Sequence, residues 1–218
     1  MRTVEQTVYQ FDELSDRAKE TARDWYRDGM ETIDYAESVI EDAARIGDII
    51  GINLRTRTAR LMGGGTRQEP HVYWSGFSSQ GDGASFVGNY SYKAGSVRAL
   101  AQEAPTGTEP HHKGNNEVNR ICRELAEVQR RNFYQLQAVI GTSGRYAHSH
   151  TMQIDVERAD DRPVSDADVE TVRELMRDFA DWIYRQLEAE WEYRHSDDVV
   201  DEDIRANEYE FDEDGNRA

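Results

Sequence analysis

Cysteine is almost missing from this chain, and long apolar runs are absent. The one cysteine, Cys122, excludes an internal disulfide and a cysteine-rich zinc site. No apolar run approaches the roughly 20 residues that a bilayer span needs. The first residues, MRTVEQTVYQF, lack the apolar core of a secretory signal. A cytoplasmic protein is therefore expected.

The standard signatures of phosphate loops and hydrolases are also lacking. The chain has no G-x-x-x-x-G-K-[ST] motif and no G-x-S-x-G elbow. Asp212 and Asp214 in the acidic tail lack the rest of an EF-hand loop. Cys122 lies at helical spacing beside Ile121 and Leu125, which indicates a buried, inert thiol. The sequence identifies no catalytic residue and no cofactor, so an enzyme is not favoured.

Basic residues are fewer than acidic residues in this chain. The chain has 43 acidic and 26 basic residues, net −17. Residues 1–50 have 13 acids and 6 bases, residues 51–159 have 9 acids and 13 bases, and residues 160–218 have 21 acids and 7 bases. Two acidic ends therefore flank a mildly basic middle, a layout that suits a basic protein partner. Because 23 of the 26 basic residues are arginine, compositional bias or a salt-adapted source is the alternative explanation.

Apolar spacing predicts the order of helices and strands. Strands are expected over 3–11, 52–60, 71–77, 84–92 and 145–157, with a last strand and turn in YEFDEDG (209–215). Helices are expected from Ser15 to Gly29, from about Thr32 to Gly47 or Gly51, from Ser96, from Asn116 to about Ile140, from Ser165 for about 29 residues, and after Ser196. A long loop is expected over 104–116, and a turn at 63–65.

These elements do not alternate strictly, which favours an α+β fold. We expect an antiparallel sheet with helices packed mainly on one face, and two long helices in the C-terminal half. Residues 104–116 give the clearest division of the chain. A single domain over 1–218 is nevertheless expected, with a strand-rich middle at 51–159, because the strands on either side of that loop would share a sheet.

The stretch YWSGFSSQGDGASF (73–86) is the main site candidate. Gly81 and Gly83 can take positive φ, and successive backbone N–H groups in such a turn can bind an anion. Trp74 and Phe77 suit base stacking or an interface anchor. The alternative is a plain hairpin connection, since Asp-Gly is a common turn pair. The candidate ligand or partner contacts in this loop are Trp74, Phe77, Ser79, Gln80, Gly81, Asp82 and Gly83.

Arginines could supply the cations of an anion site. Arg55 and Arg57 share a face of the expected strand at 52–60. With Lys93 and Arg145 they could surround an anionic ligand at the glycine loop. The alternative is a solvated sheet face with charges paired to acidic helices.

Two histidines have a spacing that a metal could use. His148 and His150 would point the same way from a strand. A third ligand would have to come from elsewhere, with Asp82 and His71 as candidates. The alternative, two histidines bonded to their neighbours, needs no metal.

Four segments of the chain resemble a family of phage and prophage proteins, sometimes labelled antitoxins. They are FDELSDRAKETARDWY, WSGFSSQGDGASF, HSHTM and SDDVVDEDIRANEYEFDEDG. The resemblance spans nearly the whole chain and implies an accessory protein of a virus in the cytoplasm of an infected bacterium. Such proteins often disable host defences by binding. The resemblance implies no catalytic residues.

Four hypotheses follow. The first is an anti-CRISPR-like or anti-restriction-like inhibitor whose acidic surface docks on a host protein that binds nucleic acid. The second is a binder that sequesters a nucleotide signal through the glycine loop. The third is an antitoxin that binds a toxin, and the fourth is a metal-dependent hydrolase built on Asp82, His148 and His150. None of them requires direct nucleic-acid binding or a membrane.

Overall fold

The computed structural model describes residues 7–30, 35–61, 63–102, 115–143 and 146–218. The chain divides into two compact units. The terminal unit comprises Met1–Tyr35 and Ala189–Ala218, and the central unit comprises Ala36–Glu188. Whether the two act as the single domain expected over 1–218 stays a prediction.

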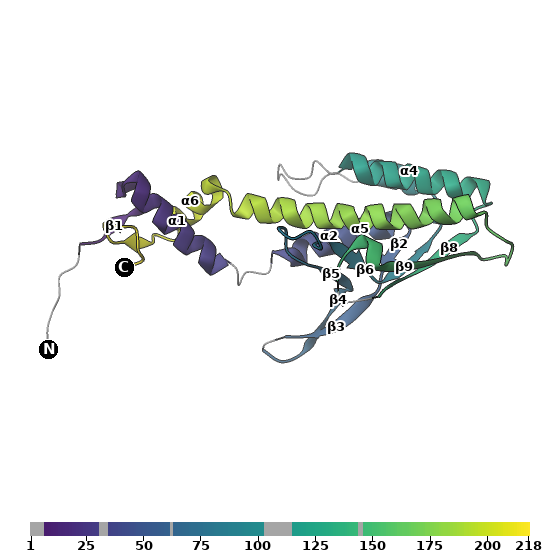
Figure 1. Ribbon diagram of the computed structural model, residues 1–218, viewed down its shortest axis with the longest axis horizontal. Helices are drawn as coiled ribbons and strands as arrows, with labels where there is room; N and C mark the ends of the chain where they lie inside the picture. Colours follow the sequence, from purple (N-terminus) through teal and green to yellow (C-terminus); the bar gives the residue numbers. More distant parts are fainter. Residues whose placement is uncertain (1–6, 31–34, 62, 103–114, 144–145) are drawn as a thin grey trace. The chain divides into compact units, whose positions relative to one another are not determined.

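An antiparallel four-stranded sheet forms the centre of the central unit (Figure 1). Its strand order is β2 (Ile52–Leu54), β7 (Gly88–Ser91), β8 (Leu136–Thr142) and β9 (Met152–Arg158). These strands come from both sides of the 104–116 segment, so the prediction that they share a sheet is confirmed. The segment itself lies almost wholly outside the described residues.

Only one face of this sheet is covered. Leu136, Ala138 and Ile140 on β8 are buried, whereas Val139 between them is 55% exposed. The side chains therefore alternate between core and solvent, as in an antiparallel sheet layered by helices. The α+β fold class is confirmed.

The longest helix supplies much of that core. α5 (Asp166–Arg194) has 29 residues, as expected, and begins where the Asp168 N–H donates to Ser165 Oγ at 3.2 Å. The Phe179 ring meets the Phe86 ring edge to face, with centroids 5.7 Å apart. The predicted apolar stripe is buried along its whole length: Val172, Met176, Phe179, Ile183 and Leu187.

The other helices of the central unit follow the predicted order. They are α2 (Ala36–Ile50), α3 (Ser96–Gln102) and α4 (Asn115–Arg131). α2 ends at Gly51, whose φ of +90° favours glycine. Within the residues that the structure describes, no helix is long and apolar enough to cross a membrane.

The expected helix from Asn116 to Ile140 is wrong in its second half. α4 stops at Arg131, and the chain turns through Phe133 and Tyr134, with φ of 56° and 61°, into β8. Leu136 and Val139 fit helical spacing, but the alternation through β8 prevails because its buried side chains complete the sheet. Sequence periodicity cannot separate these two patterns over so few residues.

The expected strand over 52–60 is also divided in two. The Arg55 N–H donates to Val87 O at 2.8 Å, and Arg55 O accepts from the His71 N–H at 2.6 Å. β2 therefore stays in the sheet, while the chain beyond Arg55 forms a hairpin of β3 (Thr56–Arg60) and β4 (Thr66–Pro70). The predicted turn of that hairpin holds Gly64 and Gly65 at positive φ.

Two further strands differ from expectation. Residues 84–92 form β6 (Ala84–Phe86) and β7, which belong to different sheets. Tyr92 is 37% exposed instead of sharing the buried face of Phe86 and Tyr90. β9 begins only at Met152, because a short 3-10 turn, η2 (Ser149–Thr151), precedes it.

The terminal unit is built from two segments that are separated by the 153 residues of the central unit. α1 (Asp16–Met30) follows the predicted Ser15 cap, and α6 (Asp197–Ala206) follows Ser196. Residues 3–6 of the strand expected over 3–11 lie outside the described residues, and in the described part the strand is limited to β1 (Tyr9–Gln10), because η1 (Phe11–Glu13) turns Phe11 into the core. β1 pairs with β10 (Glu210–Phe211), which confirms the last predicted strand. The buried core consists of Phe11, Leu14, Ala18, Ala22, Met30, Val200, Ile204 and Phe211.

Candidate functional site

The glycine loop connects two strands of a small hairpin in the central unit. β5 (Val72–Trp74) pairs antiparallel with β6, with Trp74 opposite Ala84. The Ser75 N–H donates to Gly83 O at 3.1 Å and closes the base of the loop. The loop is a hairpin connection, but one that spans 75–83, much longer than a two-residue Asp-Gly turn.

Asp82 organises the loop from inside. Its Oδ2 accepts from the N–H groups of Ser79 at 2.6 Å and Ser78 at 3.0 Å. These two bonds, led by the one from Ser79, hold the pKa of Asp82 below its usual range. The N–H groups of Ser78 and Ser79 are therefore occupied by the protein's own carboxylate and not by an external anion, and anion binding by the rest of the loop stays a prediction.

Gly83 allows close packing of the loop against a neighbouring segment and does not adopt a positive φ. Neither Gly81 nor Gly83 is among the glycines with positive φ, so that expectation is wrong. A Cβ on Gly83 would lie 3.0 Å from His148 Cδ2 and 3.2 Å from Ala147 O. The base of the loop therefore lies directly against residues 147–148, where only glycine fits without a shift.

The two aromatic residues of the loop stack on each other. The Trp74 and Phe77 rings are 5.7 Å apart at 18°, and Phe77 also contacts the Tyr184 ring on α5 at 5.4 Å. The Tyr184 hydroxyl donates to Gly76 O at 2.8 Å. Helix α5 thus holds one side of the loop in place.

Residues of the loop also line a pocket of about 560 Å³. Two of its rings are exposed, Tyr73 by 39% and Tyr146 by 70%. The Ser75 hydroxyl is buried and helps to lower the pKa of Asp82, yet it makes no well-formed hydrogen bond with a described residue. The lining consists of Arg57, Val72, Tyr73, Trp74, Ser75, Ser79, Gly81, Asp82, Tyr146 and Ala147.

The structure brings part of the predicted site together. Five predicted residues line the pocket: Arg57, Trp74, Ser79, Gly81 and Asp82. Phe77 faces α5, Gly83 is buried behind the loop, and Gln80 is exposed outside the lining. Arg145 lies outside the described residues. The sequence reading missed Tyr73, Ser75 and Tyr146, although Tyr73 flanks the glycine loop in the quoted stretch.

The arginines form a smaller group than expected. Arg57 lies 3.6 Å from Glu69 across the β3–β4 ribbon, and its side chain is half exposed. Burial, and then the positive charges of Arg57 and Arg55, lower the pKa of His71, so both arginines act near this histidine. Lys93 is not part of the group, because it binds Asp48 at 2.9 Å.

The histidine pair stacks without forming a metal site. The rings of His148 and His150 are 5.3 Å apart at 16°, although a 3-10 turn rather than a strand presents them. His148 Nδ1 accepts from the His150 N–H at 3.1 Å, and His71 Nε2 lies 2.6 Å from the Tyr73 hydroxyl. Among the described residues no group of three His, Cys, Asp or Glu could hold a metal. Neither Asp82 nor His71 therefore completes the site. Cys122 is buried, and burial raises the pKa of its thiol.

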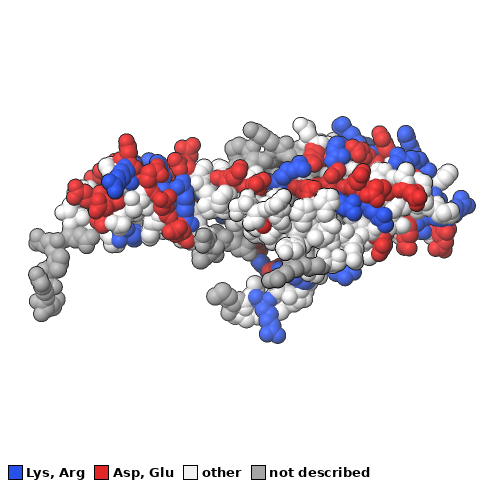
Figure 2. All heavy atoms as spheres, viewed as in Figure 1, with Lys and Arg blue, Asp and Glu red and all other residues white. Residues whose placement is uncertain are grey.

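Acidic side chains define a second candidate surface, on the terminal unit. This unit has 21 acids and 8 bases, net −13, in under a third of the chain, whereas the central unit has 22 and 18, net −4. Figure 2 shows its acidic atoms in red, interspersed with the blue atoms of basic residues. Nine exposed carboxylates of this unit have no side-chain partner among the described residues: Asp16, Asp28, Glu192, Asp198, Glu202, Glu208, Glu210, Glu213 and Asp214.

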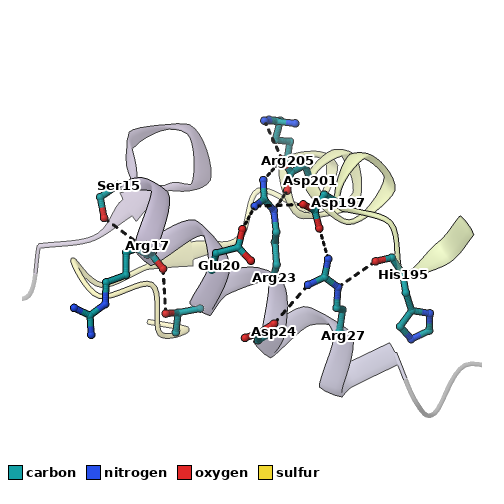
Figure 3. Close-up of polar contacts among 12 residues, drawn as sticks. Ser15, Arg17, Glu20, Arg23, Asp24, Arg27, His195, Asp197, Asp201 and Arg205 are labelled. Carbon is teal, nitrogen blue, oxygen red and sulfur yellow. Dashed lines mark hydrogen bonds and ion pairs between the residues drawn. The ribbon is translucent and has the colours of Figure 1, made fainter. Parts of the chain in front are cut away.

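Ion pairs between arginines of α1 and carboxylates of α6 hold these two helices together (Figure 3). The exposed acids lie on the structure that these ion pairs stabilise. Arg23 donates to both oxygens of Asp201, at 2.6 and 2.9 Å, and also binds Glu20. Arg27 binds Asp197 and donates to His195 O at 3.1 Å. The paired acids are structural, and the unpaired ones remain available to solvent or to a partner.

Comparison with known proteins assigns the chain to a family. No curated protein and no solved structure matches the chain. A family model described as a domain of unknown function, DUF8835, matches residues 35–197, which include the whole central unit with its sheet and pocket. Over that range, three quarters of its length, the chain belongs to the DUF8835 family.

Proposed function

We propose that this protein acts by binding, and that its terminal unit docks on a basic protein surface of the kind that holds nucleic acid. By occupying that surface, the chain would keep nucleic acid away from it. The uneven distribution of charge is the observation on which the proposal rests. A net charge of −13 belongs to the terminal unit, against −4 for the larger central unit.

Such a charge field suits a basic partner for two reasons. It speeds encounter with a positive patch, and it disfavours acidic competitors. Exposed acids that lack an internal partner lose no ion pair on binding. Asp198 and Glu202 are two of these; they lie one helical turn apart on α6, with Cβ atoms about 6 Å apart. The partner can therefore meet a row of carboxylates at fixed spacing.

The terminal unit also presents these charges on an ordered frame. The Trp25 ring packs edge to face on Tyr209 and Phe211, at 5.2 and 5.7 Å. Ion pairs from Arg23 and Arg27 join α1 to α6. A pre-organised surface loses less conformational entropy on binding than a disordered acidic tail.

The resemblance to phage and prophage proteins suggests the biological context in which this binding would act. Two of the resembling segments, FDELSDRAKETARDWY and SDDVVDEDIRANEYEFDEDG, belong to the terminal unit. A phage accessory protein that blocks a nucleic-acid groove would act as an inhibitor of a host defence complex. A metal-dependent hydrolase is not proposed, because the described residues assemble no third ligand.

A competition assay tests the proposal. The full chain is titrated into complexes of a labelled DNA duplex with purified bacterial defence nucleases and their basic-grooved subunits. We expect release of the duplex, measured by fluorescence anisotropy, with an effect that weakens as salt is raised. If the chain releases no duplex from any of them even at low salt, the proposal is wrong.

Two matched double variants distinguish the effect of the α6 surface on competition from the effect of total net charge. Asp198→Asn with Glu202→Gln removes two exposed acids of α6, whereas Glu127→Gln with Glu174→Gln removes two exposed acids of the central unit. The α6 pair should weaken competition about tenfold, equal to about 1.4 kcal/mol, and the control pair much less. Equal losses would mean that only total charge matters and would contradict docking through the terminal unit.

A further inference from the structure

The pocket beside the β5–β6 loop is a second site, and its chemistry is unlike that of the acidic terminal unit. It lies wholly in the central unit and has a volume of about 560 Å³, within the usual range for small-ligand sites. Its walls combine three aromatic rings with one arginine and one carboxylate. This mixture restricts the class of ligand that fits.

The aromatic walls favour a flat ligand. Tyr73 and Tyr146 line the pocket with exposed rings, and Trp74 between the loop and the pocket is backed by Phe77. Stacking on aromatic faces stabilises any nucleobase, because every base has a π-face. Two large exposed rings beside one cavity also leave apolar surface that a ligand would cover.

The arginines favour an anionic group on the ligand. Arg57 is half exposed and only loosely paired with Glu69 at 3.6 Å. Arg55 is close enough to act on the same histidine, His71, and forms no ion pair with a described residue. Arginine is well suited to phosphate, because its donors match two oxygens at once. A cationic ligand would be repelled by this pair.

Asp82 favours hydrogen-bond donors on the ligand. Its Oδ2 is held by the N–H groups of Ser78 and Ser79, which fixes the carboxylate in place and keeps it ionised. Oδ1 remains an acceptor, as an ionised carboxylate accepts but does not donate. It suits an exocyclic amino group of a base.

From this arrangement we infer that the pocket binds a nucleotide with an amino-bearing base: the base stacks between Tyr73 and Tyr146, its amino edge meets Asp82, and its phosphate meets Arg57. All residues that line the pocket belong to the central unit, whereas the proposed docking surface belongs to the terminal unit.

Thermal stability and calorimetry with defined probes test this inference. AMP, GMP, CMP, UMP, adenosine and ribose 5-phosphate are added separately to the full chain. A ligand that binds only the native state raises its melting temperature. We expect AMP, GMP or CMP to do so, UMP to do so less because uracil has no amino group, and adenosine and ribose 5-phosphate to do so least. No rise with any nucleotide at millimolar concentration, or equal binding of ribose 5-phosphate, overturns the inference.

Three variants locate the site. Arg57→Gln and Tyr146→Ala change exposed side chains of the lining and should weaken the best nucleotide at least tenfold. Arg60→Gln is the control, because Arg60 is an exposed arginine on the same strand but does not line the pocket. Equal weakening by Arg57→Gln and Arg60→Gln would overturn the assignment. The Asp198→Asn, Glu202→Gln variant should bind the nucleotide as the unaltered chain does, which separates this result from the docking test.

Discussion

Arg23 on α1 and Asp201 on α6 form a bidentate ion pair that joins the two segments of the terminal unit. The Arg23 Nε donates to Asp201 Oδ1 at 2.6 Å and its Nη2 donates to Oδ2 at 2.9 Å. Both side chains are only 15% exposed. Loss of one partner from a bidentate ion pair that is largely buried lowers stability strongly, because the remaining charge is poorly solvated.

We therefore predict that Arg23→Ala destabilises the terminal unit by about 2–4 kcal/mol. Arg17→Ala on the same helix is the control: its exposed guanidinium makes no ion pair with a described residue, and its cost should stay within about 0.5 kcal/mol. Urea unfolding followed by hydrogen exchange of α1 measures both. A similar, small change for the two variants would contradict the structural role of Arg23.

The same pair makes the terminal unit sensitive to acid. The hydrogen bond from Arg23 lowers the pKa of Asp201 in the folded state, while in the unfolded chain an aspartate titrates near 3.9. The stabilisation is therefore complete above the unfolded pKa and is lost as pH falls from about 4 through the lower folded pKa. Urea midpoints at pH 3 to 7 should fall less steeply at the acid end for Arg23→Ala than for the unaltered chain.

Gly83→Ala should destabilise the central unit by about 1–3 kcal/mol, because its Cβ would press on the backbone at residues 147–148. Gly81→Ala is the matched control in the same loop. A Cβ there meets only Tyr146 Cδ1, at an ordinary 3.9 Å. Melting temperatures of the two variants decide the matter, and a Gly81→Ala loss as large as that of Gly83→Ala would be unexpected.

Gln129 is the buried polar residue whose loss should be most damaging. Its side chain donates to Leu136 O at 2.7 Å and to the Tyr90 hydroxyl at 3.1 Å, and it accepts from the Leu136 N–H at 3.1 Å. Gln129→Leu leaves these groups unsatisfied and should cost about 2–4 kcal/mol. Tyr90→Phe removes only one of the three bonds and should cost less in the same denaturant titration.

Glu208 offers a stabilising change. It follows α6 with φ of 53°, a conformation that is unfavourable for a residue with a Cβ. Glu208→Gly should raise stability by about 0.5–1 kcal/mol. Glu208→Ala removes the same charge but keeps the Cβ, so it should not. Equal gains for the two would trace the effect to charge instead of backbone strain.

Strong, long periodic patterns were predictable from the sequence. The 29 residues of α5 follow one apolar stripe and one serine cap, so local chemistry and packing agree. The α4–β8 boundary was not predictable, because Leu136 and Val139 satisfy a helical spacing by chance. What ends the helix is a turn in which Phe133 and Tyr134 adopt positive φ, and aromatic residues give no signal for that conformation.

The site was predictable only in part. Trp74 and Asp82 stand out beside glycines, and both line the pocket. Tyr146 comes from a segment some 70 positions further along the chain, and no spacing rule relates it to them. The internal role of Asp82 could not be foreseen either, since a carboxylate and two backbone N–H groups form a bond only once the loop has closed.

The construction of the terminal unit has a consequence for how the chain is made. β1 pairs with β10, and α1 packs with α6, so each half of this unit lacks its partner until the other has been synthesised. The apolar stripe of α1 (Asp16–Met30) cannot be covered by α6 (Asp197–Ala206) until more than 150 further residues have been synthesised. Folding of the acidic unit therefore requires synthesis through Phe211: a chain interrupted before that residue would contain the residues that line the pocket but would lack β10, the strand that pairs with β1.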